Sequence, residues 1–93
     1  MLIKPTKGNL KKLEALFREF DYKVRYEKGH FQSGYCIVNH QKVIIINKFY
    51  KIDARIRCLL DILKIVDFPK TELSEESQAL YDKLAPSLKE TED

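Results

Sequence analysis

Two cysteines and two histidines are the residues of this chain with the most evident capacity for chemistry. Zinc takes four nitrogen or sulfur ligands, so one ion could in principle be held by His30, Cys36, His40 and Cys58. Zinc sites present their ligands in close pairs, such as two cysteines separated by two residues, and no such pair occurs here. We therefore expect no metal site, two turn histidines and two reduced thiols that act as small apolar side chains.

No pattern typical of an enzyme accompanies these residues. A nucleophilic cysteine needs a neighbouring base, whereas Cys36 falls within a predicted strand and Cys58 among apolar residues of a predicted helix. Acidic residues gather near the C-terminus, where solvated helix faces are expected, and the three glycines are too scattered for a phosphate-binding loop. The sequence thus predicts a protein without enzymatic activity and without a cofactor.

Charge is distributed unevenly along the 93 residues. Residues 1–57 hold thirteen Lys and Arg against five acids, a net charge of +8, and residues 58–93 have a net charge of −5. This division favours either two halves that neutralise each other or a basic face for an acidic partner. The longest apolar run, residues 43–46, is too short to span a bilayer, and no signal-peptide pattern is present. The expected location is the cytoplasm, with no membrane partner and no evident small-molecule substrate.

Hydrophobic periodicity predicts an α+β fold: a helix, a three-stranded antiparallel β-meander, and two further helices. Side-chain alternation places the strands at residues 22–27, 31–38 and 42–47, with short turns between them. The domain is expected to cover residues 1–88, and the acidic residues 89–93 are expected to fray.

Three amphipathic segments supply the predicted helices. The first begins near Thr6 or Asn9, either of which can cap the free amides of a helix N-terminus. The second, residues 54–66, is apolar over more than one stripe and should be the most buried. The third begins after Thr71 or Ser74 and is acidic in its first turn, as the helix dipole favours.

The third predicted strand is apolar on both of its faces. Val43 and Ile45 point one way and Ile44 and Ile46 the other, whereas a strand in a half-solvated sheet has one polar face. Either the last helix covers the second face, or that face is an interface. The sequence does not decide which of the two pairs points outward.

From this excess of apolar surface we predict a non-enzymatic interaction domain. It would form a homodimer or dock on another protein, because one apolar pair is left over once the helices pack on the sheet. The residues predicted to form the interaction surface are Lys42, Ile44, Ile46 and Lys48.

An alternative prediction is a nucleic-acid-binding module. Cations on the first predicted hairpin could contact phosphates while an aromatic side chain stacks on a base. The residues predicted for this role are Lys23, Arg25, Tyr26 and Lys28.

A third prediction comes from the segment VIIIN at residues 43–47, followed by a loop and an apolar helix. This arrangement resembles the core of zincin-like metallopeptidases of the immunity-repressor protease type, in which such a strand precedes a helix bearing HExxH. The matching segment, residues 60–64, has Leu60 and Lys64 at the positions of the two metal-binding histidines, and Asp61 at that of the catalytic glutamate. The resemblance implies a helix-sheet-helix fold without metal or peptidase activity.

Overall fold

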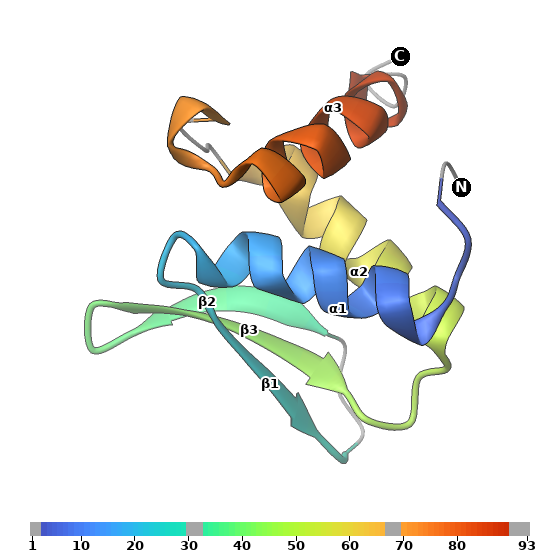
Figure 1. The fold of residues 1–93 in the computed structure, drawn as a ribbon. Coiled ribbons are helices and arrows are strands. Elements are labelled where there is room, and N and C mark those ends of the chain that lie inside the picture. The colour runs from blue at the N-terminus through green and yellow to red at the C-terminus, as the bar shows by residue number, and fades with distance from the viewer. Residues whose placement is uncertain (1–2, 30–32, 67–69, 90–93) are drawn as a thin grey trace.

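The computed structural model describes residues 3–29, 33–66 and 70–89. Within them the chain forms three α-helices, three strands and a short 3-10 helix: α1 (Lys7–Arg18), β1 (Lys23–Glu27), β2 (Gly34–Val38), β3 (Gln41–Asn47), α2 (Ile52–Ile65), η1 (Lys70–Glu72) and α3 (Glu75–Lys89). The helices lie on one side of the sheet, and α3 is the farthest from the strands (Figure 1). The predicted α+β class, with three helices and a three-stranded sheet, is confirmed.

Side-chain caps fix the starts of α1 and α3. The hydroxyl of Thr6 accepts a hydrogen bond from the backbone N–H three residues later, at 3.1 Å. Ser74 does the same at the start of α3, at 3.2 Å, so both of these predicted caps are confirmed. Lys89, predicted to lie in a frayed tail, is the last residue of α3, and the remainder of that tail, residues 90–93, lies outside the described residues.

The sheet is mixed, so the predicted antiparallel meander is wrong. Its strand order is β1-β3-β2, which places β1 beside β3 instead of beside β2. β1 runs parallel to β3, with Val24 opposite Ile44, and β2 runs antiparallel to β3, with Cys36 opposite Val43. Because β1 and β2 are not neighbours in the sheet, these two strands do not form the predicted hairpin, and His30 of the predicted turn lies outside the described residues.

The composition of the strands explains this order. β3 is apolar on both faces, and the central position gives it a neighbouring strand on each side. In β1 every second residue is charged, which suits an edge position where one side of the strand meets water. A meander would instead have placed β2 at the centre and β3 at an edge. The alternation of side chains located the strands in the sequence but did not show which strand is central in the sheet.

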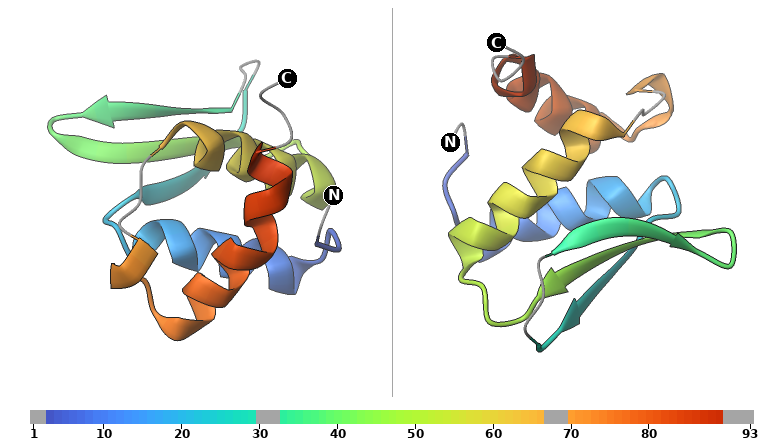
Figure 2. Two further views of the ribbon diagram at one scale, coloured as in Figure 1. Left: turned by 90° about the horizontal axis from the view of Figure 1, so that it is seen from above. Right: turned by 180° about the vertical axis from the view of Figure 1, so that it is seen from behind.

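The hydrophobic core lies between the covered face of the sheet and the first two helices. Among the described residues, nine side chains of the core have less than 2% of their surface exposed: Leu13, Leu16, Phe17, Ile44, Ile46, Ile56, Leu59, Leu63 and Leu84. Only the last of these belongs to α3, so α3 packs on the outside of the α1–α2 layer (Figure 2). The opposite face of the sheet carries no described helix.

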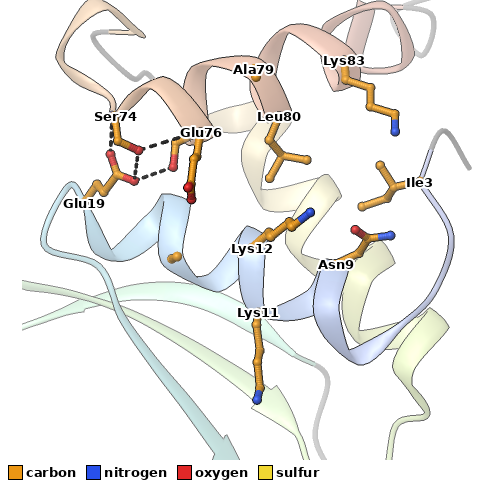
Figure 3. A pocket seen from close by; sticks show the side chains of 12 residues that line it. Ile3, Asn9, Lys11, Lys12, Glu19, Ser74, Glu76, Ala79, Leu80 and Lys83 are labelled. Atoms are coloured by element: carbon orange, nitrogen blue, oxygen red, sulfur yellow. Dashed lines mark hydrogen bonds between the residues drawn. The ribbon is translucent and has the colours of Figure 1, made fainter.

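One carboxylate clamps α3 to the end of α1. Glu19 accepts hydrogen bonds from the backbone N–H of Ser74 at 2.7 Å and from its hydroxyl at 2.9 Å, and a further one from the hydroxyl of Ser77 (Figure 3). These bonds stabilise the ionised form, so the hydroxyl of Ser77 first, and then the amide of Ser74, lower the pKa of Glu19 below its ordinary value of 4.5.

This clamp predicts an acid-dependent loss of stability. Because the pKa of Glu19 is lower in the folded state than in the unfolded one, its contribution is complete above pH 4.5 and is lost as the pH falls through the folded-state pKa. Between pH 7 and pH 3, the urea midpoint should therefore fall further for the wild type than for Glu19→Gln. The matched control is Glu76→Gln, an exposed acid in the first turn of α3 that lies near Glu19, and it should lose stability in acid as the wild type does (Figure 3). Equal acid sensitivity of wild type and Glu19→Gln would contradict the role of the clamp.

Candidate interaction surface

The two isoleucines predicted to form an interaction surface are instead part of the core. Ile44 and Ile46 are both 0% exposed and lie beneath the helices. The pair that points away from the helices is Val43 and Ile45. The sequence left this choice open because a strand that is apolar on both faces contains no signal for which face the helices cover.

The two lysines predicted to flank that surface lie at opposite ends of β3. Lys42, near its start, places its ammonium group 5.0 Å from the centre of the Tyr22 ring, a cation–π contact on the helix side of the sheet. Lys48 follows the other end of the strand, where its backbone N–H donates to Glu27 O at 2.8 Å. The four predicted residues therefore do not form one surface.

The open face of the sheet is mixed in character. Val43 is only 4% exposed although no described helix covers it, because neighbouring strands carry side chains on both sides of it. Arg25 and Glu27 form an ion pair at 2.8 Å on the β1 side of this face. The apolar surface at the centre of the open face is thus narrow, and charges border it on one side.

Apolar surface is more accessible on β2, the edge strand on the other side of the sheet. Ile37 is 63% exposed and Val38 is 50% exposed, and Cys36 beside them is also exposed. β2 contains no charged residue, whereas β1, the opposite edge, contains three. Charged side chains are a common protection against unwanted pairing at an edge, and β2 lacks it.

The turn that joins β2 to β3 determines which backbone groups of β2 face outward. Asn39 and His40 have φ values of 51° and 66°, as the two central residues of a type I′ hairpin turn require. In such a turn Val38 and Gln41 form a hydrogen-bonded pair, and along an antiparallel ladder bonded and non-bonded pairs alternate. The backbone groups of Tyr35 and Ile37 therefore point away from β3, toward the open edge.

The residues predicted for nucleic-acid binding are divided between the two faces. Lys23 and Arg25 are exposed on the open face, and Lys28 is exposed just beyond β1. Tyr26 instead points to the helix side, where its hydroxyl donates a hydrogen bond to the buried carboxylate of Glu14. It is therefore not placed beside these cations to stack on a base.

The environment of Tyr26 makes it a structural residue. The guanidinium of Arg55 lies 4.9 Å from the centre of its ring and also donates to the backbone carbonyls of Tyr50 and Lys48, each at 2.9 Å. Burial raises the pKa of Tyr26, and the hydrogen bond to Glu14 raises it further, so the phenol keeps its proton. This network ties α1, β1 and the start of α2 together.

The candidate chemical residues that the structure describes do not form a metal site. In the described part of the chain no three His, Cys, Asp or Glu side chains are close enough to hold a metal ion, and His30 lies outside it. Cys58 is half-buried, and burial raises the pKa of its thiol. Asp61 is exposed and pairs with Lys64 at 3.4 Å.

The exposed strand β2 was not singled out from the sequence. A signal was present: GYCIV at residues 34–38 has no charge, while KVRYE at 23–27 has three. Its meaning depends on which strands form the edges, and the predicted meander placed this strand at the centre.

Comparisons of this chain with models of protein families, with curated proteins and with solved structures find no match. The resemblance to zincin-like peptidases accordingly stays a prediction. Among the helices of the described residues, none has both the length and the apolar character needed to cross a bilayer.

Proposed function

We propose that this protein is an interaction domain that forms a homodimer through the open edge of β2. The observation that carries the proposal is the exposure of Ile37 and Val38 on an edge strand that has no charged residue. The proposed partner of this edge is β2 of a second copy, because two β2 strands can pair through their outward backbone groups and their side chains are complementary. Two β2 strands would then join two sheets into one of six strands.

One antiparallel register satisfies the edge. A two-fold axis at Cys36 would pair Tyr35 of one copy with Ile37 of the other, and these are the residues whose backbone groups face outward. This pair exchanges two N–H···O hydrogen bonds, and so does the symmetry-related pair of Ile37 in the first copy with Tyr35 in the second. A typical net contribution is about 0.5–1.5 kcal/mol per bond.

The side chains fit the same register. On the helix side, the exposed Ile37 of each copy would meet Tyr35 of the other, a cross-strand pair of an aliphatic and an aromatic side chain. On the open face, Val38 would lie over Gly34 of the other copy, where no atom lies within 4 Å of the position of a Cβ. The exposed apolar side chains of β2 would thus each gain a neighbour, and no two like charges would meet.

Light scattering behind size-exclusion chromatography tests the proposal. We expect the mass to rise with protein concentration from that of one 11.0 kDa chain toward that of two, at low and at high salt alike, because the contact is uncharged. A monomer at all concentrations would contradict it. If that monomer bound a DNA or RNA oligomer only at low salt, the nucleic-acid alternative would be favoured instead.

A further inference from the structure

A groove between α1 and α3, on the side of the molecule away from the open sheet face, has no part in this proposed association. Its volume is about 630 Å³, within the range of sites that bind small organic molecules. Along α1 and its C-cap the lining runs from Asn9 to Glu19, a span of ten residue steps that corresponds to about 15 Å of helix. The groove is thus elongated and follows the helix.

The groove opens because α1 and α3 are joined at only one end. The hydrogen bonds of Glu19 hold the start of α3 against the end of α1. Away from this clamp the two helices diverge, and the N-terminal segment with Ile3 lies beside the space between them (Figure 3). The apolar part of the lining consists of Ile3, Ala15, Ala79 and Leu80.

The two ends of the groove differ in charge. Lys12 of α1 and Lys83 of α3 extend toward its open end, near Ile3. Neither ammonium group forms an ion pair in the part of the chain that the structure describes. The acids of the lining, Glu19 and Glu76, lie at the clamped end. The carboxylate of Glu19 already accepts hydrogen bonds from Ser74 and Ser77.

From this polarity we infer that the groove binds a linear amphiphile with one anionic head, such as a medium-chain carboxylate. The head would lie between the ammonium groups of Lys12 and Lys83, and the alkyl chain would cover Leu80 and Ala15 toward the clamped end. Unpaired ammonium groups at one end of an apolar trough favour an anion there, while the trough gains from covering its apolar surface.

The test uses decanoate below its micelle concentration as the probe, in an NMR titration of the full chain. We expect saturable binding with shifts along α1 and α3, and dissociation constants at least ten times higher for Lys12→Glu and for Lys83→Glu. The matched control is Lys28→Glu, the same charge change at an exposed lysine just beyond β1, which does not line the groove. Its affinity should stay within about twofold of the wild type.

A second variant tests the trough without changing a charge. Ala15 is an exposed residue of α1, so Ala15→Trp should fill the groove without disturbing the core, and decanoate should then fail to bind. Neutral 1-decanol and acetate should each bind far more weakly than decanoate. Equal binding of 1-decanol, or equal losses in Lys28→Glu and Lys83→Glu, would overturn the inference. The groove does not involve β2, so a monomeric variant should still bind decanoate.

Discussion

Replacement of Ile37 by lysine should convert the protein from a concentration-dependent dimer to a monomer. Each copy would lose the apolar contact of its isoleucine with Tyr35 of the other copy and place a hydrated charge at the uncharged edge. A lost contact of about 1–1.5 kcal/mol per copy, twice over, raises the dissociation constant by roughly 100-fold. Light scattering at matched concentrations measures the change. Because Ile37 is 63% exposed in the single chain, the substitution should leave its fold intact.

The control for this substitution is Ile65→Lys. Ile65 is 73% exposed, so its apolar side chain is about as accessible to water as that of Ile37. It is the last residue of α2, which rises away from the sheet toward this end (Figure 2). The variant should dimerise like the wild type. If both lysine variants were monomeric, general loss of apolar surface and not the β2 edge would explain the effect.

Substitution of adjacent isoleucines in β3 should have unequal effects on stability. Ile44 is fully buried beneath the helices, and Ile44→Ala should reduce the free energy of unfolding by about 2–5 kcal/mol, through lost burial and the cavity it leaves. A small domain has only about 5–15 kcal/mol in total, so this variant should be close to unfolding. Ile45 is partly exposed on the open face, and Ile45→Ala should cost about 1 kcal/mol or less.

Urea denaturation at a concentration where the chain is monomeric gives both free energies. The comparison decides between the two orientations of β3 that the sequence allowed. A larger loss for Ile45→Ala than for Ile44→Ala would mean that the helices cover the other face of the sheet.

The parts of the fold that follow from local patterns could be predicted. The first amphipathic segment marks α1, and one of the two cap candidates predicted for each helix, Thr6 for α1 and Ser74 for α3, is the cap in the structure, because a cap acts on amides only three residues away. Alternation located the strands because successive side chains of a strand point to opposite faces of the sheet. These signals concern neighbours in the sequence, and they needed no knowledge of the tertiary structure.

The strand order could not be predicted in this way, and the interaction surface was misplaced as a consequence. Parallel pairing of β1 with β3 joins residues twenty positions apart, such as Val24 and Ile44, and leaves no local trace. Once β3 is central, Ile44 and Ile46 enter the core and β2 becomes an edge. The absence of charge in residues 34–38 then acquires a meaning that it lacks in a meander.

The most direct test of β2 pairing is a cross-link at Cys36. In the proposed register Cys36 of one chain lies directly opposite Cys36 of the other, as a non-hydrogen-bonded pair across the two-fold axis. The Cα atoms of such a pair are about 4.5 Å apart, and disulfides form over Cα distances of about 4.4–6.8 Å. Oxidised glutathione would take up the two electrons and two protons of the thiols and leave as two molecules of reduced glutathione. Non-reducing electrophoresis then measures the covalent dimer.

We predict a covalent dimer that forms readily in the wild type and in Cys58→Ser, but not in Cys36→Ser, and that is strongly slowed by Ile37→Lys although Cys36 is still present. Cross-linking in Ile37→Lys at the wild-type rate, or a dimer by light scattering that forms no disulfide at Cys36, would contradict pairing of the two β2 strands in this register.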